Sequence, residues 1–222
     1  EINYTGSIEI KYSNPLHVEL EYSSLLPYTD SIPDGDIFYS VDGESLSGQL
    51  DYNPLTGNYS FSEESITLEA NDIPYNLKIY GNATNYQYVS EIYLLKVNPI
   101  ESNAQFIIED DYRVSSTYLK SAYGENVSFL VNFTDVSGAV LQDSSLEVYM
   151  SGEQLSSNYY HYISNGEFEG LWNVSFDSRL YSPGMFQLLA ELQKPNYEVL
   201  NQSMSVEILD FWDAKIVVSD PP

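Results

Sequence analysis

The stretch GENVSFLVN, residues 124–132, places an apolar side chain at every second position. Val127, Phe129 and Val131 point to one side of an extended chain, and the residues between them point to the other. This period of two is typical of a β-strand with one buried face. Short segments with the same period follow one another along the chain, separated by turn residues such as Asn165-Gly166. The sequence therefore predicts an all-β protein.

The stretch has a counterpart 109 residues earlier, where Val18, Leu20 and Tyr22 show the same alternation. Four further matches follow in the same order, at offsets of 109 to 111 residues: VDGESL (41–46) with MSGEQL (150–155), GNY (57–59) with GEF (166–168), NY (85–86) with NY (196–197), and AQFII (104–108) with AKIVV (214–218). An ordered series of matches indicates a duplicated domain, and about 110 residues is the size of an immunoglobulin-like sandwich. We therefore predict two tandem immunoglobulin-like antiparallel β-sandwich domains.

The repeat sets the expected domains at residues 1–103 and 104–212, with 213–222 left over. Residues 104–109 form the predicted first strand of the second domain, so the matching segment near the end of the chain is a predicted first strand as well. That segment consists of Ala214, Lys215, Ile216, Val217 and Val218. The first domain lacks such a strand of its own, because Glu1 aligns with Asp110.

Two explanations remain open for the first strand that the first domain lacks and the additional strand near the end of the chain. In the first, the chain is a segment of a longer array, and residues 213–222 begin a third repeat. In the second, residues 214–218 complete the first domain of another copy by head-to-tail strand donation. An exposed sheet edge is a template for such pairing, and a contact that does not close produces a filament.

Charge and composition exclude several kinds of partner. The chain carries 33 acidic residues against 8 Lys and Arg, a formal net charge of −25. Such a surface repels phosphate backbones and anionic lipid, so no nucleic-acid partner is expected.

The absence of cysteine removes disulfides, thiolate nucleophiles and Cys-ligated zinc. No apolar run approaches the ~18 residues that span a membrane, so no direct membrane insertion is expected in this segment. No signal peptide precedes Glu1, and we expect any export signal to be removed or to lie outside this sequence.

Asn-x-Ser/Thr sequons indicate an extracellular setting. They occur at Asn3, Asn58, Asn82, Asn126, Asn132, Asn173 and Asn201. Most of these acceptors have the polar parity of a predicted strand, opposite its apolar residues, so their side chains are expected to point to solvent. A bulky glycan requires such a position. The alternative is that a surface rich in Ser and Asn generates sequons without use. We predict N-linked glycans, and a secreted or cell-surface protein.

Catalytic chemistry has few candidates. His17 and His161 lie in strand patterns, away from any metal-ligand spacing or nucleophile elbow. Glycines are spread singly at turns, so no phosphate-binding loop is present. We therefore expect no enzyme, and no catalytic residue or cofactor apart from the calcium considered next. Ser62 to Asn71 is the best candidate for a short helical turn.

Calcium is the one cofactor that the acidic residues suggest. Hard cations need several oxygen ligands, and carboxylates cluster after a turn and at the proposed domain junction. The candidate ligands are Asp34, Asp36, Glu109, Asp110 and Asp111. Neither cluster matches the EF-hand loop, and a solvated acidic surface is the alternative.

Tyrosine is abundant, with 21 residues in the chain. Tyr159, Tyr160 and Tyr162 follow a Ser-rich turn and form a candidate aromatic face for stacking sugars. Aromatic residues also suit half-buried strands, so ordinary packing is the alternative. The two interpretations differ in whether the rings are exposed in a row or buried.

Residues 124–209 resemble the immunoglobulin-like repeats of archaeal and bacterial cell-surface glycoproteins. The elements that carry the resemblance are Gly124-Glu125-Asn126-Val127, Asn165-Gly166-x-Phe168, Pro183-Gly184-x-Phe186-x-Leu188, Lys194-x-Asn196-Tyr197 and Met204-x-Val206-x-Ile208. The first domain carries the pattern more weakly, without the Gly after Pro74 and without the Lys. The resemblance implies a role in cell-envelope structure such as an S-layer, in filaments or in adhesion, and it carries over no catalytic residue.

Three classes of function remain. A structural or adhesive envelope component, whose partners are other copies or neighbouring repeats, fits the repeat, the sequons and the acidity. A carbohydrate- or ligand-binding module of a larger secreted protein fits the abundant tyrosine. A non-catalytic accessory domain of a secreted enzyme is the third. Fold alone does not decide among them, and we favour the first.

Overall fold

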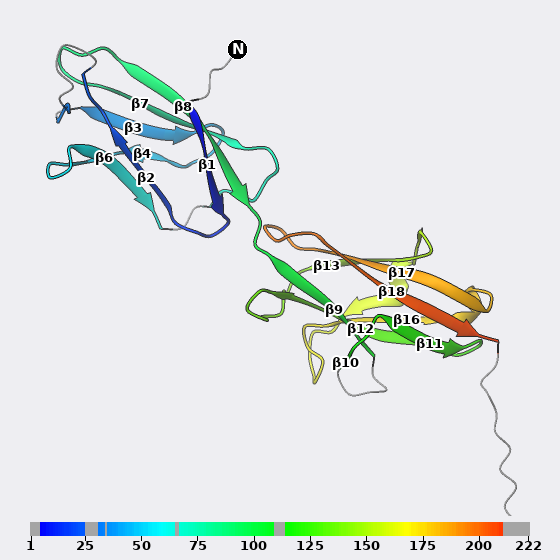
Figure 1. Ribbon diagram of the computed structural model, residues 1–222. Helices are drawn as coiled ribbons and strands as arrows, with labels where there is room; N and C mark the ends of the chain where they lie inside the picture. The colour runs from blue at the N-terminus through cyan, green and yellow to red at the C-terminus, as the bar shows by residue number, and fades with distance from the viewer. Residues whose placement is uncertain (1–4, 25–30, 34, 65–66, 109–113, 211–222) are drawn as a thin grey trace, which may run out of the picture. The chain divides into compact units, whose positions relative to one another are not determined.

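The computed structural model describes residues 5–24, 31–33, 35–64, 67–108 and 114–210. Its ordered elements are strands and two single turns of 3-10 helix, so the predicted all-β class is confirmed (Figure 1). No helix among the described residues is long and apolar enough to cross a membrane. The chain divides into two compact units, Glu1–Ile100 and Glu101–Pro222. Each unit is an antiparallel sandwich of two sheets, closed on one side by a parallel strand pair, which confirms the tandem immunoglobulin-like architecture.

The described residues of the first unit form eight strands. They are β1 (Gly6–Lys11), β2 (Leu16–Glu21), β3 (Asp36–Val41), β4 (Ser47–Gln49), β5 (Asp51–Asn53), β6 (Asn58–Glu63), β7 (Tyr75–Asn82) and β8 (Val89–Asn98). One sheet has the order β1-β8-β7-β3-β4 and the other has the order β2-β6-β5. β1 runs parallel to β8, and the other pairs are antiparallel.

The second unit repeats this plan with two additional strands. Its strands are β9 (Ser102–Ile108), β10 (Val114–Ser115), β11 (Tyr118–Ala122), β12 (Asn126–Asp135), β13 (Ser145–Met150), β14 (Glu153–Gln154), β15 (Tyr160–Tyr162), β16 (Trp172–Asp177), β17 (Gly184–Gln193) and β18 (Leu200–Leu209). The single helical turns are η2 (Ser157–Tyr159) and η3 (Ser178–Leu180). The sheet order β11-β18-β17-β13-β14 matches that of the first unit strand for strand. The second sheet, β10-β9-β12-β16-β15, carries β9 and β10 in addition.

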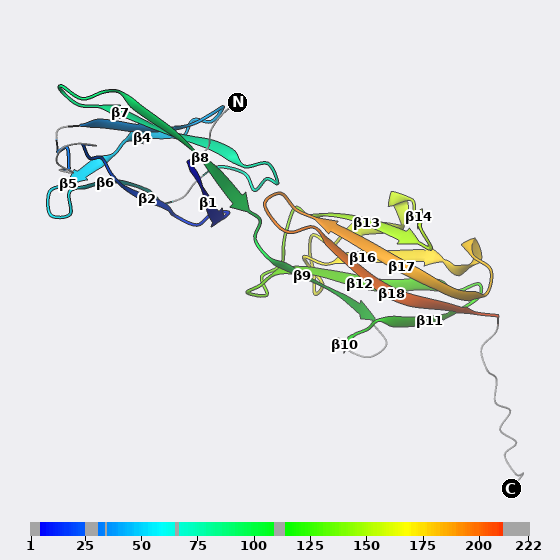
Figure 2. The same ribbon diagram turned by 45° about the horizontal axis from the view of Figure 1, so that its top comes forward.

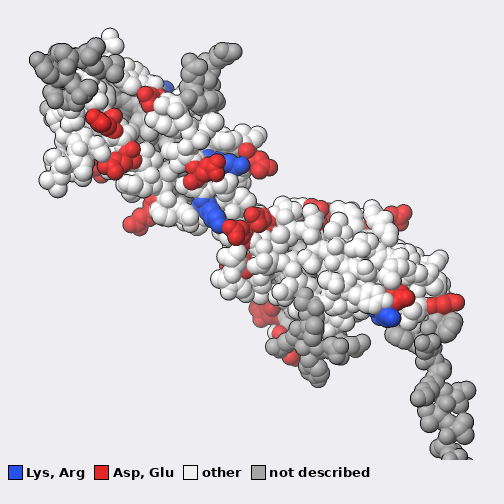
Figure 3. All heavy atoms as spheres, in the orientation of Figure 1, with Lys and Arg blue, Asp and Glu red and all other residues white. Residues whose placement is uncertain are grey.

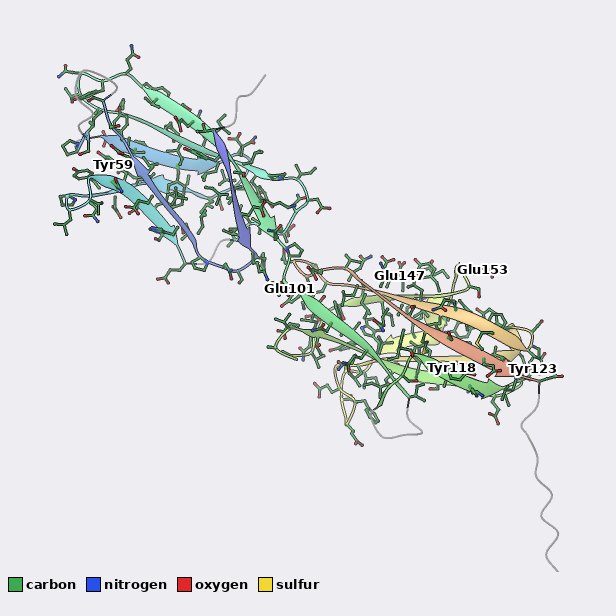
Figure 4. The ribbon with its side chains drawn as sticks, in the orientation of Figure 1. Tyr59, Glu101, Tyr118, Tyr123, Glu147 and Glu153 are labelled. Atoms are coloured by element: carbon green, nitrogen blue, oxygen red, sulfur yellow. The ribbon has the colours of Figure 1, made fainter. Side chains whose placement is uncertain are left out.

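Alternation within the strands builds each core. In β12, Val127, Phe129 and Val131 are at most 1% exposed, as the period of two predicts. The core of the first unit holds tyrosines as well as aliphatic residues: Tyr59 is 1% exposed, and its hydroxyl donates a hydrogen bond to the carbonyl oxygen of Ile32 at 2.6 Å (Figure 4). A buried tyrosine is stable when its hydroxyl has a partner, as here.

The best sequence candidate for a short helical turn, residues 62–71, is not helical in the part of that range that the structure describes. Ser62 and Glu63 end strand β6, and residues 67–71 are irregular. Leu68 is 2% exposed and belongs to the core of the first unit. The segment therefore runs between strands and is held by one buried side chain. The helical turns are found instead in the second unit, after Ser156 and Asp177, whose side chains accept a backbone hydrogen bond from the first turn.

Tyr39 should make the first unit lose stability above pH 10. Its side chain is 4% exposed, its ring lies 3.8 Å from that of Phe61 between centroids, and its hydroxyl donates to the Glu63 carboxylate. Burial first, and then Glu63, raise the pKa of Tyr39 to about 12. The unfolded chain releases this proton near pH 10.0. Between the two values the folded state holds a proton that the unfolded state has lost, so the free energy of unfolding falls as pH rises.

Calorimetry of the wild type and of Tyr39→Phe measures this effect. From about pH 9 to about pH 11.5, the wild-type first unit should lose about 2 kcal/mol more than the variant. The variant is the control for the other tyrosines, which titrate in both proteins. Equal losses in the two proteins would contradict the assignment.

Candidate functional site

The two units differ at the edge of one strand. In the second unit β12 has neighbours on both sides, pairing with β16 from Asn126 to Val131 and with β9 from Leu130 to Asp135 (Figure 2). Its counterpart β2 pairs with β6 along its whole length. Among the residues that the structure describes, β2 has no strand on its other side. Along the described residues of β2, the backbone groups on this side are thus available to another strand.

The open edge leaves part of the first unit's core uncovered. Val18 and Leu20 of β2 are half-buried, whereas their counterparts Val127 and Phe129 are 1% and 0% exposed. For Phe129, the second unit shows one source of this cover: the Phe106 ring of β9 packs on it edge to face. Val89, at the start of β8, is 42% exposed although it pairs with the inward-facing Gly81. Exposed apolar side chains along one edge are typical of a surface that another chain covers.

A groove lies behind this edge, between the two sheets of the first unit. We name it the acceptor groove and define it by its lining residues: Leu20, Glu21, Tyr22, Ile37, Ile79, Tyr80, Gly81, Val89, Glu91 and Tyr93. They come from β2 and the residue that follows it on one side, and from β3, β7 and β8 on the other. Its free volume of about 110 Å³ is of the order that accommodates one apolar side chain.

The second unit shows what fills the equivalent space. Phe106 of β9 lies opposite Val131 in the pairing of β9 with β12. Its side chain is 0% exposed and packs edge to face on Phe129, with 5.5 Å between ring centroids. β9 also contacts β18, the counterpart of β8. Phe106 therefore closes the sandwich between β12 and β18, the position that corresponds to the acceptor groove.

The rim of the acceptor groove is acidic. Glu21 and Glu91 both line it and are exposed. The Tyr93 hydroxyl donates to the Glu91 carboxylate at 2.9 Å. Burial first, and then the hydrogen bond to Glu91, raise the pKa of Tyr93 above its ordinary value, so this hydroxyl keeps its proton to a higher pH than an exposed tyrosine does. The acceptor groove is apolar inside and has carboxylates at its rim, so it suits a ligand segment in which an apolar side chain lies next to a cationic one.

Half of the residues of the sequence-predicted sites lie outside the described part of the chain. This holds for the proposed donor strand 214–218 and for four of the five candidate calcium ligands, Asp34, Glu109, Asp110 and Asp111. The fifth, Asp36, is exposed and accepts a hydrogen bond from Gln49 at 3.3 Å. Within the described residues no group of three or more acidic or histidine side chains could hold a metal ion. Acidic residues are instead dispersed over both units on the face seen in Figure 3. Calcium binding stays a prediction.

The tyrosine run of the second unit forms strand β15 and its approach. Tyr159, Tyr160 and Tyr162 are half-buried, and the first two pack against the core. Tyr162 meets Trp172 edge to face, with 5.6 Å between ring centroids. These contacts are those of strand packing, and the structure does not bring the three rings together as an exposed row. A ligand role for them stays a prediction.

Three sequon asparagines have exposed side chains: Asn82, Asn126 and Asn201. Asn3 lies outside the described residues. Asn58 and Asn173 are half-buried, and the Asn58 amide nitrogen donates to Glu19 at 2.8 Å. The expectation that every acceptor points to solvent is wrong for Asn132, whose side-chain oxygen is buried without a hydrogen-bond partner. Asn132 pairs with Gln105 of β9 in the middle of a sheet, where neighbours on both sides flank an outward side chain.

The fold defines a class, tandem two-layer immunoglobulin-like sandwiches, and solved structures of that class are similar to this chain. A titin structure is 13% identical, with 92% of this chain and 95% of that chain covered and a TM-score of 0.36. Fibronectin(III)-like modules of Clostridium thermocellum CbhA are 9% identical, with 96% of each chain covered and a TM-score of 0.35. Tandem Ig repeats of Dlar are 9% identical, with 93% and 95% covered and a TM-score of 0.30. No family model and no curated protein matches the sequence.

Proposed function

We propose that this chain is a non-catalytic structural subunit of an extracellular filament or cell envelope, assembled head to tail by strand donation. By the register of β9 on β12, residues Ala214–Val218 of one copy add along residues 20–24 of the next, at the end of β2 and just beyond it. The observation that carries the proposal is the acceptor groove: among the described residues, β2 has no strand on its other side and a groove of about 110 Å³ lies beside it, where the second unit has β9 and Phe106.

The repeat supplies the register of the donated strand. AKIVV (214–218) matches AQFII (104–108), so Ile216 takes the place of Phe106. Phe106 lies opposite Val131, whose counterpart in the first unit is Tyr22. Ile216 therefore lies opposite Tyr22 and enters the acceptor groove. Burial of one isoleucine side chain contributes roughly 2 kcal/mol, in addition to the backbone hydrogen bonds of the new strand pair.

Charge supports the same register. Lys215 is the only Lys or Arg after Lys194. With Ile216 opposite Tyr22, Lys215 lies opposite Ser23 and diagonal to Glu21 on the outer face of the sheet. Cross-strand pairs of opposite charge at this spacing contribute roughly 0.2 to 1 kcal/mol. The single cation of the tail thus comes beside the carboxylate rim.

Donation from the end of one copy to the first unit of the next is a heterologous contact. Such contacts produce open fibres when the rotation between copies does not close a ring. Each copy in the interior of the fibre then has both its edge and its tail paired, which removes the aggregation liability of an exposed edge strand. The exposed sequons at Asn82, Asn126 and Asn201 fit the secreted or surface location of such a fibre.

Deleting residues 213–222 tests the proposal. Light scattering coupled to size-exclusion chromatography, followed by electron microscopy, should show polymers for the full chain and monomers for the deletion variant. Deleting only 219–222, outside the donated segment, is the matched control and should leave the polymers intact. Polymers that survive the larger deletion, or a full chain that stays monomeric across a concentration series, would overturn strand donation and leave the edge to another segment or partner.

A further inference from the structure

An aromatic cluster lies on the outer face of the first unit, away from its core. Tyr80 of β7 is flanked by Phe38 of β3, with 5.8 Å between ring centroids, and by Tyr88, with 6.4 Å between centroids. Tyr88 is 59% exposed, and the other two rings are half-buried. The inward positions of β7, Leu77 and Ile79, supply the core, so these rings are on the opposite face of the sheet.

The fold does not require aromatic residues at these positions. By the pairing of β3 with β7 and of β13 with β17, Phe38 corresponds to Glu147 and Tyr80 corresponds to Glu191. The second unit thus has two glutamates where the first has two aromatic rings, on the same strands of the same sheet (Glu147 is labelled in Figure 4). The shared architecture therefore does not itself demand aromatic rings at these two positions.

A sequon begins two residues beyond Tyr80. Asn82 ends β7, is exposed, and lies opposite Asp36 of β3. Residues two apart on a strand share a face and lie roughly 6.5 to 7 Å apart, so the Asn82 side chain projects beside the Tyr80 ring. Extending the β7–β8 register by one step beyond Gly81 and Val89 places Tyr88 across from Asn82. A sugar attached to Asn82 would have one ring next to it along the strand and another across from it.

The other sequons lack this arrangement. The residues two before Asn58, Asn126, Asn132, Asn173 and Asn201 are Thr56, Gly124, Leu130, Leu171 and Val199. None of them is aromatic. The position of Asn82 in the second unit is Gln193, so sequon and aromatic cluster are both present in the first unit and both absent from the same place in the second.

We propose that Asn82 is an occupied N-glycosylation site whose first sugar packs on Tyr80, with Tyr88 as a side wall. The amide nitrogen of Asn82 carries the sugar, and the apolar C–H face of the sugar ring covers an aromatic ring that is otherwise half-exposed. The other flank of Tyr80 is already used in a similar way: Lys78, two residues before it, holds its Nζ 5.5 Å from the ring centroid. The first sugar of this glycan thus packs on the surface of the first unit and stabilises it, whereas an ordinary surface glycan extends into solvent.

A double-mutant cycle between Asn82 and Tyr80, with the full chain produced in a glycosylating host, tests the proposed packing of the sugar on Tyr80. Glycopeptide mass spectrometry should find Asn82 occupied. Asn82→Gln should lower the melting temperature of the first unit by about 4 °C in the wild type, and by less than about 1 °C in a Tyr80→Ser background. Tyr80→Phe, which keeps the ring, should retain the full shift. Tyr80 also lines the acceptor groove, but it has the strand parity opposite to Leu77 and Ile79, so these variants leave the core side chains of β7 unchanged.

Asn201→Gln is the matched control, because that exposed sequon has Val199 and Ser203 as its same-face neighbours. Its removal should shift the melting temperature of the second unit by less than about 1 °C. When both are made without glycosylation, the wild type and the Asn82→Gln variant should melt at the same temperature. An unoccupied Asn82, or an equal shift with and without the Tyr80 ring, would overturn the proposal. Because Tyr80 lines the acceptor groove, the Tyr80 variants are also examined by light scattering, and melting temperatures are compared only between proteins in the same assembly state.

Discussion

Ile216→Asp should convert the polymers of the full-length chain into monomers. The repeat places Ile216 opposite Tyr22 and into the acceptor groove, which Leu20 and Ile79 line with apolar atoms. An aspartate there either leaves a buried charge without a partner or forces the strand out of register. The first costs at least about 3 kcal/mol, which weakens each contact by about 100-fold. The rim adds to this cost, because Glu21 and Glu91 repel a further carboxylate.

Light scattering over a concentration series measures the change. Ser219→Asp is the control, since it adds the same charge outside the donated segment and should leave the polymers unchanged. A peptide covering residues 212–220 should raise the melting temperature of the first unit in the deletion variant, and its Ile216→Asp version should not. If Ile216→Asp polymerises as well as the wild type, the register proposed for the donated strand is wrong.

Much of the fold could be predicted because it depends on local alternation and on the internal repeat. The period of two at Val127, Phe129 and Val131 gives a strand with one buried face, and the match with Val18 and Leu20 transfers that strand to the first unit. The parallel pairing of β1 with β8 was not predictable in this way, because it joins segments more than 80 residues apart in sequence. A repeat shows that two units share a topology, but it does not show which strands are neighbours.

The candidate site was predicted only in part. The missing first strand follows from the repeat, because nothing in the first domain aligns with residues 104–108. The groove itself does not, because its shape depends on contacts across the two sheets. At Gly81, for instance, an added Cβ would lie 2.3 Å from the Ile37 side chain. The exposure of a side chain on the outer face of a sheet cannot be predicted from strand alternation either. Leu130 has the polar parity of its strand and is nevertheless 3% exposed.

Phe106→Ala should destabilise the second unit by about 3 to 5 kcal/mol. Phe106 is 0% exposed, lies between the sheets and makes an edge-to-face contact with Phe129. Removing the ring leaves a cavity at the place where β9 closes the sandwich. The loss is a large part of the stability of a domain of this size, for which 5 to 15 kcal/mol is typical, as an order of magnitude. Urea unfolding followed by Trp172 fluorescence reports on this unit, since Trp172 hydrogen-bonds to Ser144 within it.

Gln105→Ala is the matched control, because Gln105 is the exposed neighbour on the same strand and its replacement should change the stability by no more than about 0.5 kcal/mol. The comparison also bears on the acceptor groove. Phe106 fills the space between β12 and β18, and its contribution to the free energy of unfolding of the second unit can be measured in this way. If that contribution is several kcal/mol, Ile216 of a donated strand can gain a comparable binding free energy by filling the acceptor groove of the first unit. A small effect of Phe106→Ala would show that the slot contributes little to either unit, and would remove the energetic basis for strand donation.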